Sequence, residues 1–179
     1  TSGSAIQACS GSTITISGDA LIKSAGYSAA IQVQGGVSDA AATTLNVDGG
    51  SITSDGSHGI SVEDSAKVNI SAGTISGNGR VASAVYAQEN STVEIIGGTL
   101  TGTKAAISES SSSQSTITVT SGTFSSDIST YTNGLPVVSD GNGNYIIRHL
   151  SEVYLNGQSG DDTKGGADVA NAVKTLDTA

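Results

Sequence analysis

The chain has 179 residues, with 24 Gly, one Pro, one Phe and no Trp, so its core cannot depend on large aromatic side chains. Its formal net charge of −9 disfavours binding to nucleic acid and to anionic membrane surfaces, because like charges repel. No apolar run approaches the ~20 residues that span a bilayer. Cys9 is the single cysteine, which excludes an intrachain disulfide, and its strand-like surroundings predict a small buried residue.

A run that alternates apolar and polar residues recurs five times along the first two thirds of the chain. A period of two indicates a strand with one buried face. The residues predicted to be buried in these runs are Ile14, Ile16, Leu45, Val47, Val68, Ile70, Val93, Ile95, Ile117 and Val119.

A short phrase with a glycine follows each alternating run. Its glycines, Gly50, Gly73, Gly98 and Gly122, are spaced 23, 25 and 24 residues apart, and a looser copy, "SGDALI", places Asp19 at the glycine position. Asp tolerates a positive φ better than most residues, so it is a plausible substitute. The tail of the phrase predicts a second strand, which buries Leu21, Ile52, Ile75, Leu100 and Phe124.

A third strand-like run completes each repeat, and its apolar positions are Ile6, Ile31, Ile60, Val85 and Ile107. Self-similarity with a period of 20 to 30 residues is typical of a solenoid, in which stacked repeats close a shared core. We therefore predict an all-β fold, a right-handed parallel β-helix over residues 1–124, with three short strands per coil and about five coils. A β-sandwich is the alternative, but it needs reversing turns, and hairpin dipeptides are few before residue 133.

The repeat pattern stops after Phe124. Residues 125–150 contain "PVVSDGNGNYII", which predicts a β-hairpin about a Gly/Asn turn, and we interpret this segment as a cap over the end of the β-helix. Residues 151–179 are predicted to form a linker or entry segment, with a short strand at Val153–Leu155 and a helix near 168–177.

The phrases "GGTLT" and "SGTFSSDISTYTNGLPVVSDGNGNY" resemble the repeats of large surface proteins of Gram-positive, often gut-dwelling, bacteria. The tail, "VYLNGQSGDDTKGG" followed by "AVKTLDTA", resembles the opening of a further β-helix of that kind. The resemblance implies a secreted protein at the bacterial cell surface. Since the chain lacks Met and begins on a third strand, we expect it to be part of a larger polypeptide with further domains.

Parallel β-helices resemble pectin lyases and polygalacturonases in fold, which raises the possibility of a catalytic site of either kind. The basic residues are scattered, without the clustered carboxylates that a calcium-dependent lyase needs. His58–Gly59 and Gly160–Asp162 echo polygalacturonase motifs, but in reversed order and at distant positions, whereas a glycosidase needs two carboxyl groups flanking one bond. We expect no enzymatic activity; a polysaccharide lyase or glycosidase of the β-helix type is the alternative.

Two acidic turns raise the question of calcium. The segment "DGNGN", 140–144, matches half of a calcium loop, but Tyr145 stands where the loop needs Gly and Ser151 where it needs Glu. A hairpin turn is favoured there, and an ordinary turn is favoured at Asp161 and Asp162. The sequence therefore predicts no metal ligand and no cofactor.

The outward residues of the strands form ladders of amides, hydroxyls and one aromatic ring. A polysaccharide or host glycan is the partner that such a face suits, and the candidate ligand-facing residues are Gln32, Asn46, Asn69, Tyr86 and Glu94. A solvated sheet face is the alternative. A further alternative is an ice-binding array formed by outward threonines of the phrase, such as Thr99 and Thr101, although threonine favours strands in any case.

These observations predict a non-catalytic structural or adhesive segment, either a rigid stalk or a module that adheres to glycans or to a host. The sequence does not choose between stalk and adhesin.

Overall fold

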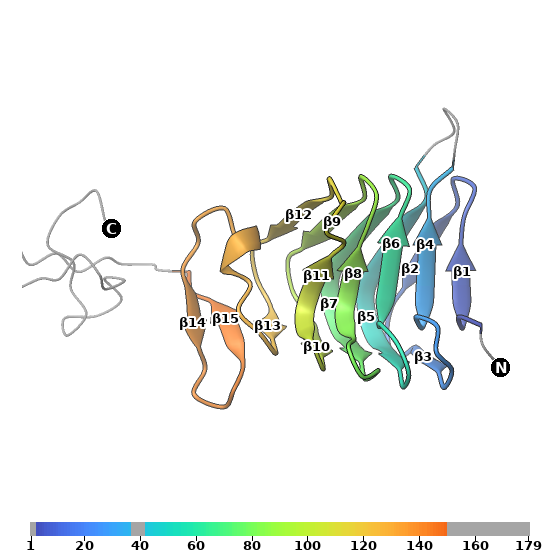
Figure 1. The fold of residues 1–179 in the computed structure, drawn as a ribbon. Helices are drawn as coiled ribbons and strands as arrows, with labels where there is room; N and C mark the ends of the chain where they lie inside the picture. The colour runs from blue at the N-terminus through green and yellow to red at the C-terminus, as the bar shows by residue number, and fades with distance from the viewer. Residues whose placement is uncertain (1–2, 37–41, 150–179) are drawn as a thin grey trace, which may run out of the picture. The chain divides into compact units, whose positions relative to one another are not determined.

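The computed structural model describes residues 3–36 and 42–149, and the chain divides into two compact units, Thr1–Ile147 and Arg148–Ala179. The first unit is an all-β solenoid of about five turns, consistent with the predicted parallel β-helix (Figure 1). The strand and helix predicted within 151–179, and Asp161 and Asp162, lie outside the described residues. Within the described ranges, no helix is long and apolar enough to cross a membrane.

One sheet of the solenoid has five parallel strands, to which successive turns contribute one strand each, and we call it the narrow sheet. Its order is that of the chain, β1, β4, β6, β8 and β11 (Figure 1). The strands span Ile6–Ala8, Ile31–Gln34, Ile60–Glu63, Ser83–Ala87 and Ala105–Glu109, respectively. The register places equivalent residues beside one another, as in Ile31, Ile60 and Val85. Like residues therefore stack on like, as the repeat predicts.

The second sheet has ten strands, and we call it the broad sheet. Its strands are β2 (Thr13–Ile16), β3 (Leu21–Ser24), β5 (Thr44–Ser54), β7 (Lys67–Gly77), β9 (Thr92–Ile95), β10 (Thr99–Gly102), β12 (Thr116–Val119), β13 (Thr123–Phe124), β14 (Val137–Ser139) and β15 (Tyr145–Ile147). In two turns the alternating run and the phrase form one continuous strand, β5 and β7, whereas in the other turns they form two. The pairings among β2 to β13 are parallel.

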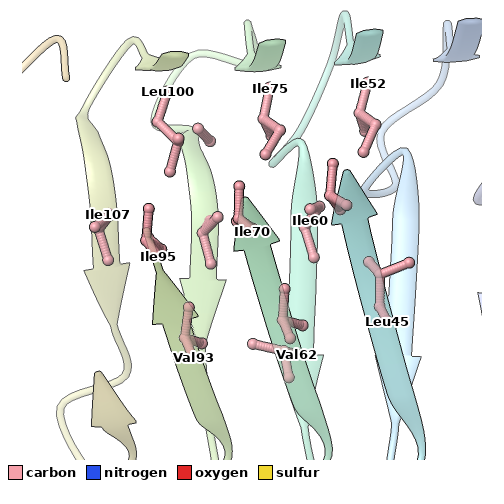
Figure 2. Close-up of a cluster of buried hydrophobic side chains, with 14 of the residues drawn as sticks. Leu45, Ile52, Ile60, Val62, Ile70, Ile75, Val93, Ile95, Leu100 and Ile107 are labelled. Atoms are coloured by element: carbon pink, nitrogen blue, oxygen red, sulfur yellow. The ribbon is translucent and has the colours of Figure 1, made fainter. Parts of the chain in front are cut away.

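The core consists of parallel rows of mainly aliphatic side chains between the two sheets, and each row contains one residue from each successive turn. Ile52, Ile75 and Leu100 lie at matching positions of successive turns and are fully buried (Figure 2). Phe124 continues this row at the last turn, because β13 pairs with β10. The other predicted core residues are buried too, except for Leu21, which is exposed, and for Ile6, Ile14 and Ile117, which are partly exposed and pack against the core.

The first turn departs from the predicted register by one residue. Leu21 is 75% exposed, and its neighbour Ile22 is the buried residue that pairs with Ile52. The backbone with positive φ is at Gly18 rather than Asp19, so Asp19 does not replace the corner glycine. The prediction that Leu21 is buried is therefore wrong: this corner contains one residue more than the alignment on Asp19 assumed.

Cys9 is a second correction. It was predicted to be buried, but it is exposed, directly after β1 ends at Ala8. Ala8 occupies the inward position of that strand and is buried, so the strand ends before the next inward position is reached.

The corner glycines of the phrase have the left-handed backbone that the repeat implies. All four, Gly50, Gly73, Gly98 and Gly122, have positive φ. At Gly73, φ is +97°, and an added Cβ would lie 2.8 Å from the carbonyl oxygen of Gly49 in the preceding turn. Both strain and close approach therefore require glycine there.

The residues after the last coil form the predicted hairpin. A short 3₁₀ helix, η1 (Ser129–Tyr131), precedes it; β14 and β15 pair antiparallel, and β15 also pairs antiparallel with β13. The turn is held by Asp140, whose Oδ1 accepts the N–H groups of Asn142 (2.8 Å) and Asn144 (3.0 Å). The Asn144 side chain and these two N–H groups lower the pKa of Asp140. The carboxylate of Asp140 thus stabilises the hairpin turn.

Replacing Asp140 by Ala removes the carboxylate oxygen that accepts both backbone N–H groups of the turn. We expect faster hydrogen exchange at the amides of Asn142 and Asn144, with no change in the solenoid turns, because these N–H groups then face water. Asp140→Asn is the matched control, since it keeps an Oδ1 acceptor for both backbone N–H groups while it loses the charge and the Oδ2 acceptor of the Asn144 side chain. Equal exchange in the wild type and Asp140→Ala would show that the carboxylate does not hold the turn.

Candidate functional site

The five candidate ligand-facing residues lie on two different sheets. Gln32 and Tyr86 are on β4 and β8 of the narrow sheet, whereas Asn46, Asn69 and Glu94 are on β5, β7 and β9 of the broad sheet. They therefore form two separate groups, one on each sheet.

On the broad sheet, the amides form a short ladder. Asn69 donates from Nδ2 to Oδ1 of Asn46 over 2.8 Å, and Asn69 pairs in register with Glu94 on the other side. Oδ1 of Asn69 is buried without a hydrogen-bond partner among the described residues. A shallow hollow of about 110 Å³ lies beside Asn69 and Glu94, and the exposed side chain of Ile96 forms part of its wall. This hollow has less than half the volume of the one on the narrow sheet.

On the narrow sheet, the structure brings Gln32 and Tyr86 to one larger hollow, of about 250 Å³. In register, Ser61 lies between these two residues, and a small side chain between two large ones leaves the space open. Four successive turns contribute to the lining. The lining includes Gln32, Ser57, His58, Ser61, Tyr86 and Gln88.

The aromatic wall of this hollow is a stacked pair of rings. His58 and Tyr86 have ring centroids 4.5 Å apart and planes inclined by 16°. Nδ1 of His58 accepts the backbone N–H of Ser83 over 3.0 Å, so in the neutral ring the proton is on Nε2. Burial, and then the positive charge of Lys104, lower the pKa of His58 from 6.5. At neutral pH the ring is therefore an uncharged partner for Tyr86.

Two glutamine amides are oriented by one carboxylate at the edge of the hollow. Nε2 of Gln32 donates to Oε1 of Glu63 over 2.9 Å, and Nε2 of Gln88 lies 3.5 Å from Oε2 of the same carboxylate. Nε2 of Gln88 also donates to the hydroxyl of Ser61 over 3.3 Å. Because a carboxylate only accepts, each amide turns its nitrogen toward Glu63. The amide oxygens are then left for other donors.

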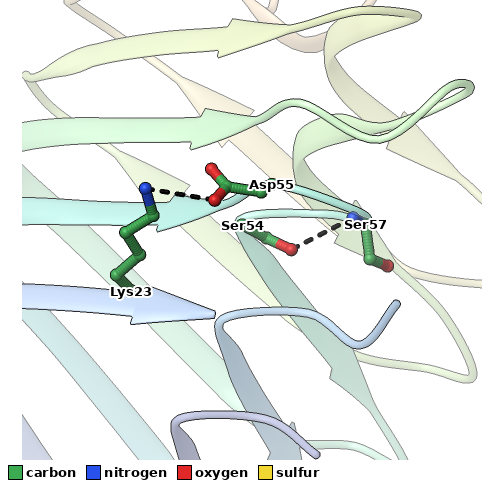
Figure 3. Close-up of polar contacts among 4 residues, drawn as sticks. All are labelled: Lys23, Ser54, Asp55 and Ser57. Atoms are coloured by element: carbon green, nitrogen blue, oxygen red, sulfur yellow. Dashed lines mark hydrogen bonds and ion pairs between the residues drawn. The ribbon is translucent and has the colours of Figure 1, made fainter. Parts of the chain in front are cut away.

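The corner that carries Ser57 and His58 is fixed by Ser54. The buried hydroxyl of Ser54 accepts the N–H of Ser57 over 3.1 Å (Figure 3) and donates to the carbonyl of Ser28 in the preceding turn over 2.9 Å. The ion pair between Lys23 and Asp55, 3.1 Å, lies beside the same corner but is solvent-exposed, so it adds little stability. Hydrogen bonds to Ser54 therefore hold one wall of the hollow.

Two stacked turns next to the hollow combine backbone strain with like charge. Asp64 and Ser65 in one turn, and Glu89 and Asn90 in the next, have φ between 48° and 63°. A hydrogen bond between the side chains of Glu89 and Asp64 raises the pKa of Glu89, and the negative charge of Asp64 raises it further. Above that raised pKa the two carboxylates repel each other.

Replacing Glu89 by Gln keeps a hydrogen-bond donor toward Asp64 and removes the repulsion. Because the pKa of Glu89 is raised in the folded state, protonated Glu89 stabilises the folded wild type at pH values below its unfolded-state pKa of 4.5. This stabilisation is lost as the pH rises through the folded-state pKa of Glu89. Glu89→Gln should therefore unfold at a higher urea concentration than the wild type at pH 7, with a smaller advantage at pH 4. Asp127→Asn, at an exposed carboxyl elsewhere, is the control; an equal difference at both pH values would contradict the account.

The sequence singled out His58 only as part of a His-Gly motif, and it did not reveal the stack with Tyr86. The two rings are 28 residues apart, so only the register of two turns shows that they meet. The sequence did contain an indication of the pair, because the residues equivalent to His58 and to Tyr86 in the other turns are small or carry an amide. In the part of the chain that the structure describes, no group of three His, Cys, Asp or Glu side chains is placed to hold a metal ion.

Comparisons with protein-family models, with curated proteins and with solved structures found no match to this chain.

Proposed function

We propose that this segment is a non-catalytic structural and adhesive element of a secreted bacterial surface protein. It acts as a stiff spacer whose polar sheet face adheres to polysaccharide or host glycans, and further domains of the same polypeptide adjoin it. The observation that carries the proposal is the unbroken parallel register of the narrow sheet from β1 to β11. A stack held by continuous backbone pairing and one shared core resists bending, as a spacer requires.

The proposal includes the finer architecture. Each coil is right-handed and has three strand segments, namely the alternating run, the tail of the phrase and the narrow-sheet strand. The hairpin caps the last coil. The antiparallel pairing of β15 with β13 supports this role, because it covers an edge that would otherwise expose unpaired backbone groups. Phe124 and Ile147, both buried, lie on these two strands.

Two measurements separate the stalk from the adhesin. Small-angle scattering of residues 1–147 tests the stiff spacer, for which we expect the profile of a rigid solenoid. A glycan array tests adhesion, and reproducible hits support it, whereas a blank array together with a rigid profile leaves the stalk alone. A flexible profile and a blank array would together overturn the proposal.

The competing function is a polysaccharide lyase or glycosidase. Incubation with pectins and xylans, followed by assays for new reducing ends and for unsaturated products, tests it. We expect no turnover above that of a heat-denatured sample. Product formation that scales with protein concentration would overturn the non-catalytic proposal.

A further inference from the structure

We infer that the hollow between Gln32 and Tyr86 is a binding site for a single neutral hexopyranose unit of a glycan. The inference rests on the adhesive part of the proposed function and names the residues and the ligand class. It depends on the one place where the narrow-sheet ladder changes from amide to serine to aromatic, at Gln32, Ser61 and Tyr86.

The size and lining of the hollow fit one sugar ring. Its 250 Å³ is below the about 300–1,000 Å³ typical of pockets for drug-sized ligands. The rings of His58 and Tyr86 supply an apolar wall for the C–H groups of a pyranose. Ser57 and Ser61 supply hydroxyl groups that both donate and accept.

The polar groups of the hollow are held in place before a ligand arrives. Glu63 fixes the amide of Gln32 and draws that of Gln88 toward it, and Ser54 fixes the corner below Ser57. Fixed groups lose little conformational entropy on binding, which favours affinity. The two amide oxygens are then available to accept hydroxyl groups of the sugar.

The charges of the hollow favour a neutral ligand. A uronate or phosphate would meet the carboxylate of Glu63 behind the amides; the ring of His58 is neutral, and Lys104, whose positive charge acts on His58, does not line the hollow. A cation would compete with the amide N–H groups of Gln32 and Gln88 for the oxygens of Glu63. An apolar ligand would leave the serine hydroxyls and the amides without partners. A neutral polyol satisfies all of these groups.

The test is a titration of the whole chain with methyl glycosides of glucose, galactose, mannose and N-acetylglucosamine, followed by ligand-detected nuclear magnetic resonance at pH 7. We expect at least one probe to bind with a Kd of about 1–10 mM, which is the range of weak small-ligand binding. Tyr86→Ser should weaken that binding about tenfold or more, since the aromatic wall is lost. This variant suits the fold, because Ser61 and Ser108 occupy the neighbouring positions of the same ladder.

Tyr27→Ser is the matched control, because Tyr27 is 90% exposed and lies outside the hollow; its binding should equal that of the wild type. If Tyr86→Ser unfolds, Gln88→Leu replaces it, with the same expected loss. Absence of binding by all four probes, or binding unchanged in the hollow variants, overturns the inference. A glycan array with hits that Tyr86→Ser leaves intact overturns the inference alone and leaves the proposed adhesive function standing.

Discussion

Ile75→Ala should lower the free energy of unfolding by about 2–5 kcal/mol, as large-to-small substitutions in packed cores do. Ile75 is fully buried between Ile52 and Leu100 of the adjacent turns, so its removal leaves a cavity inside the stack. Urea unfolding measures the loss. Hydrogen exchange locates it, and the largest effect is expected in β7 and its neighbours, because stability in a solenoid is set by contacts between adjacent turns.

Leu21→Ala is the control for Ile75→Ala, since the sequence pattern assigns both residues to the same buried row. The structure exposes Leu21 and buries Ile22 in its place, so Leu21→Ala should change stability by no more than about 0.5 kcal/mol. Ile22→Ala should cost clearly more than Leu21→Ala. The reverse order would contradict the register of the first turn.

Gly77→Ala should lower the free energy of unfolding at least as much as the loss of a core side chain does. An added Cβ would lie 2.2 Å from the carbonyl oxygen of Ser83 and 2.7 Å from its carbonyl carbon. Both are backbone atoms, so the corner between β7 and β8 has to shift as a whole. We expect a loss of more than about 3 kcal/mol, within the range of the severe single mutations, or a chain that fails to fold.

Two other glycines separate steric overlap from backbone strain. Among the described residues, no atom lies within 4 Å of a Cβ added at Gly36, and its φ is not positive, so Gly36→Ala should be close to neutral. Gly18 has open space but a φ of +61°, so Gly18→Ala should cost about 1–2 kcal/mol through strain alone. Thermal unfolding of the three variants should therefore rank Gly36→Ala above Gly18→Ala and Gly18→Ala above Gly77→Ala. Equal stability of all three would refute the packing described at the corner.

Most of the fold could be predicted because a solenoid repeats the same physical constraint. The spacing of Gly50, Gly73, Gly98 and Gly122 predicted the turns, and all four adopt positive φ. The alternation within each run predicted the buried face. The error at Leu21 arose because Asp19 was aligned with the corner glycines. The charge of Lys23 argues against that alignment, because a buried Leu21 would place Lys23 on the same inward face. A buried Ile22 instead places Ser24 there, which matches the buried pair Ile52 and Ser54 of the next turn.

The candidate site could be predicted only in part. Gln32 and Tyr86 were named from their outward positions, and the structure brings them to one hollow. The contributions of His58, Glu63 and Gln88 depend on contacts between turns, over 25 to 31 residues of sequence. The position of a residue in a strand predicts whether its side chain points inward or outward. It does not predict which side chain of the next turn contacts it.

We propose that the repeats build the scaffold and that binding resides where the turns differ. Amide chemical-shift mapping during titration with the tightest-binding methyl hexoside tests it most directly. We predict one site per chain, with shifts confined to residues 28–34, 57–63 and 83–88. Shifts that recur at equivalent ladder positions of every turn, or none near Tyr86, would contradict it.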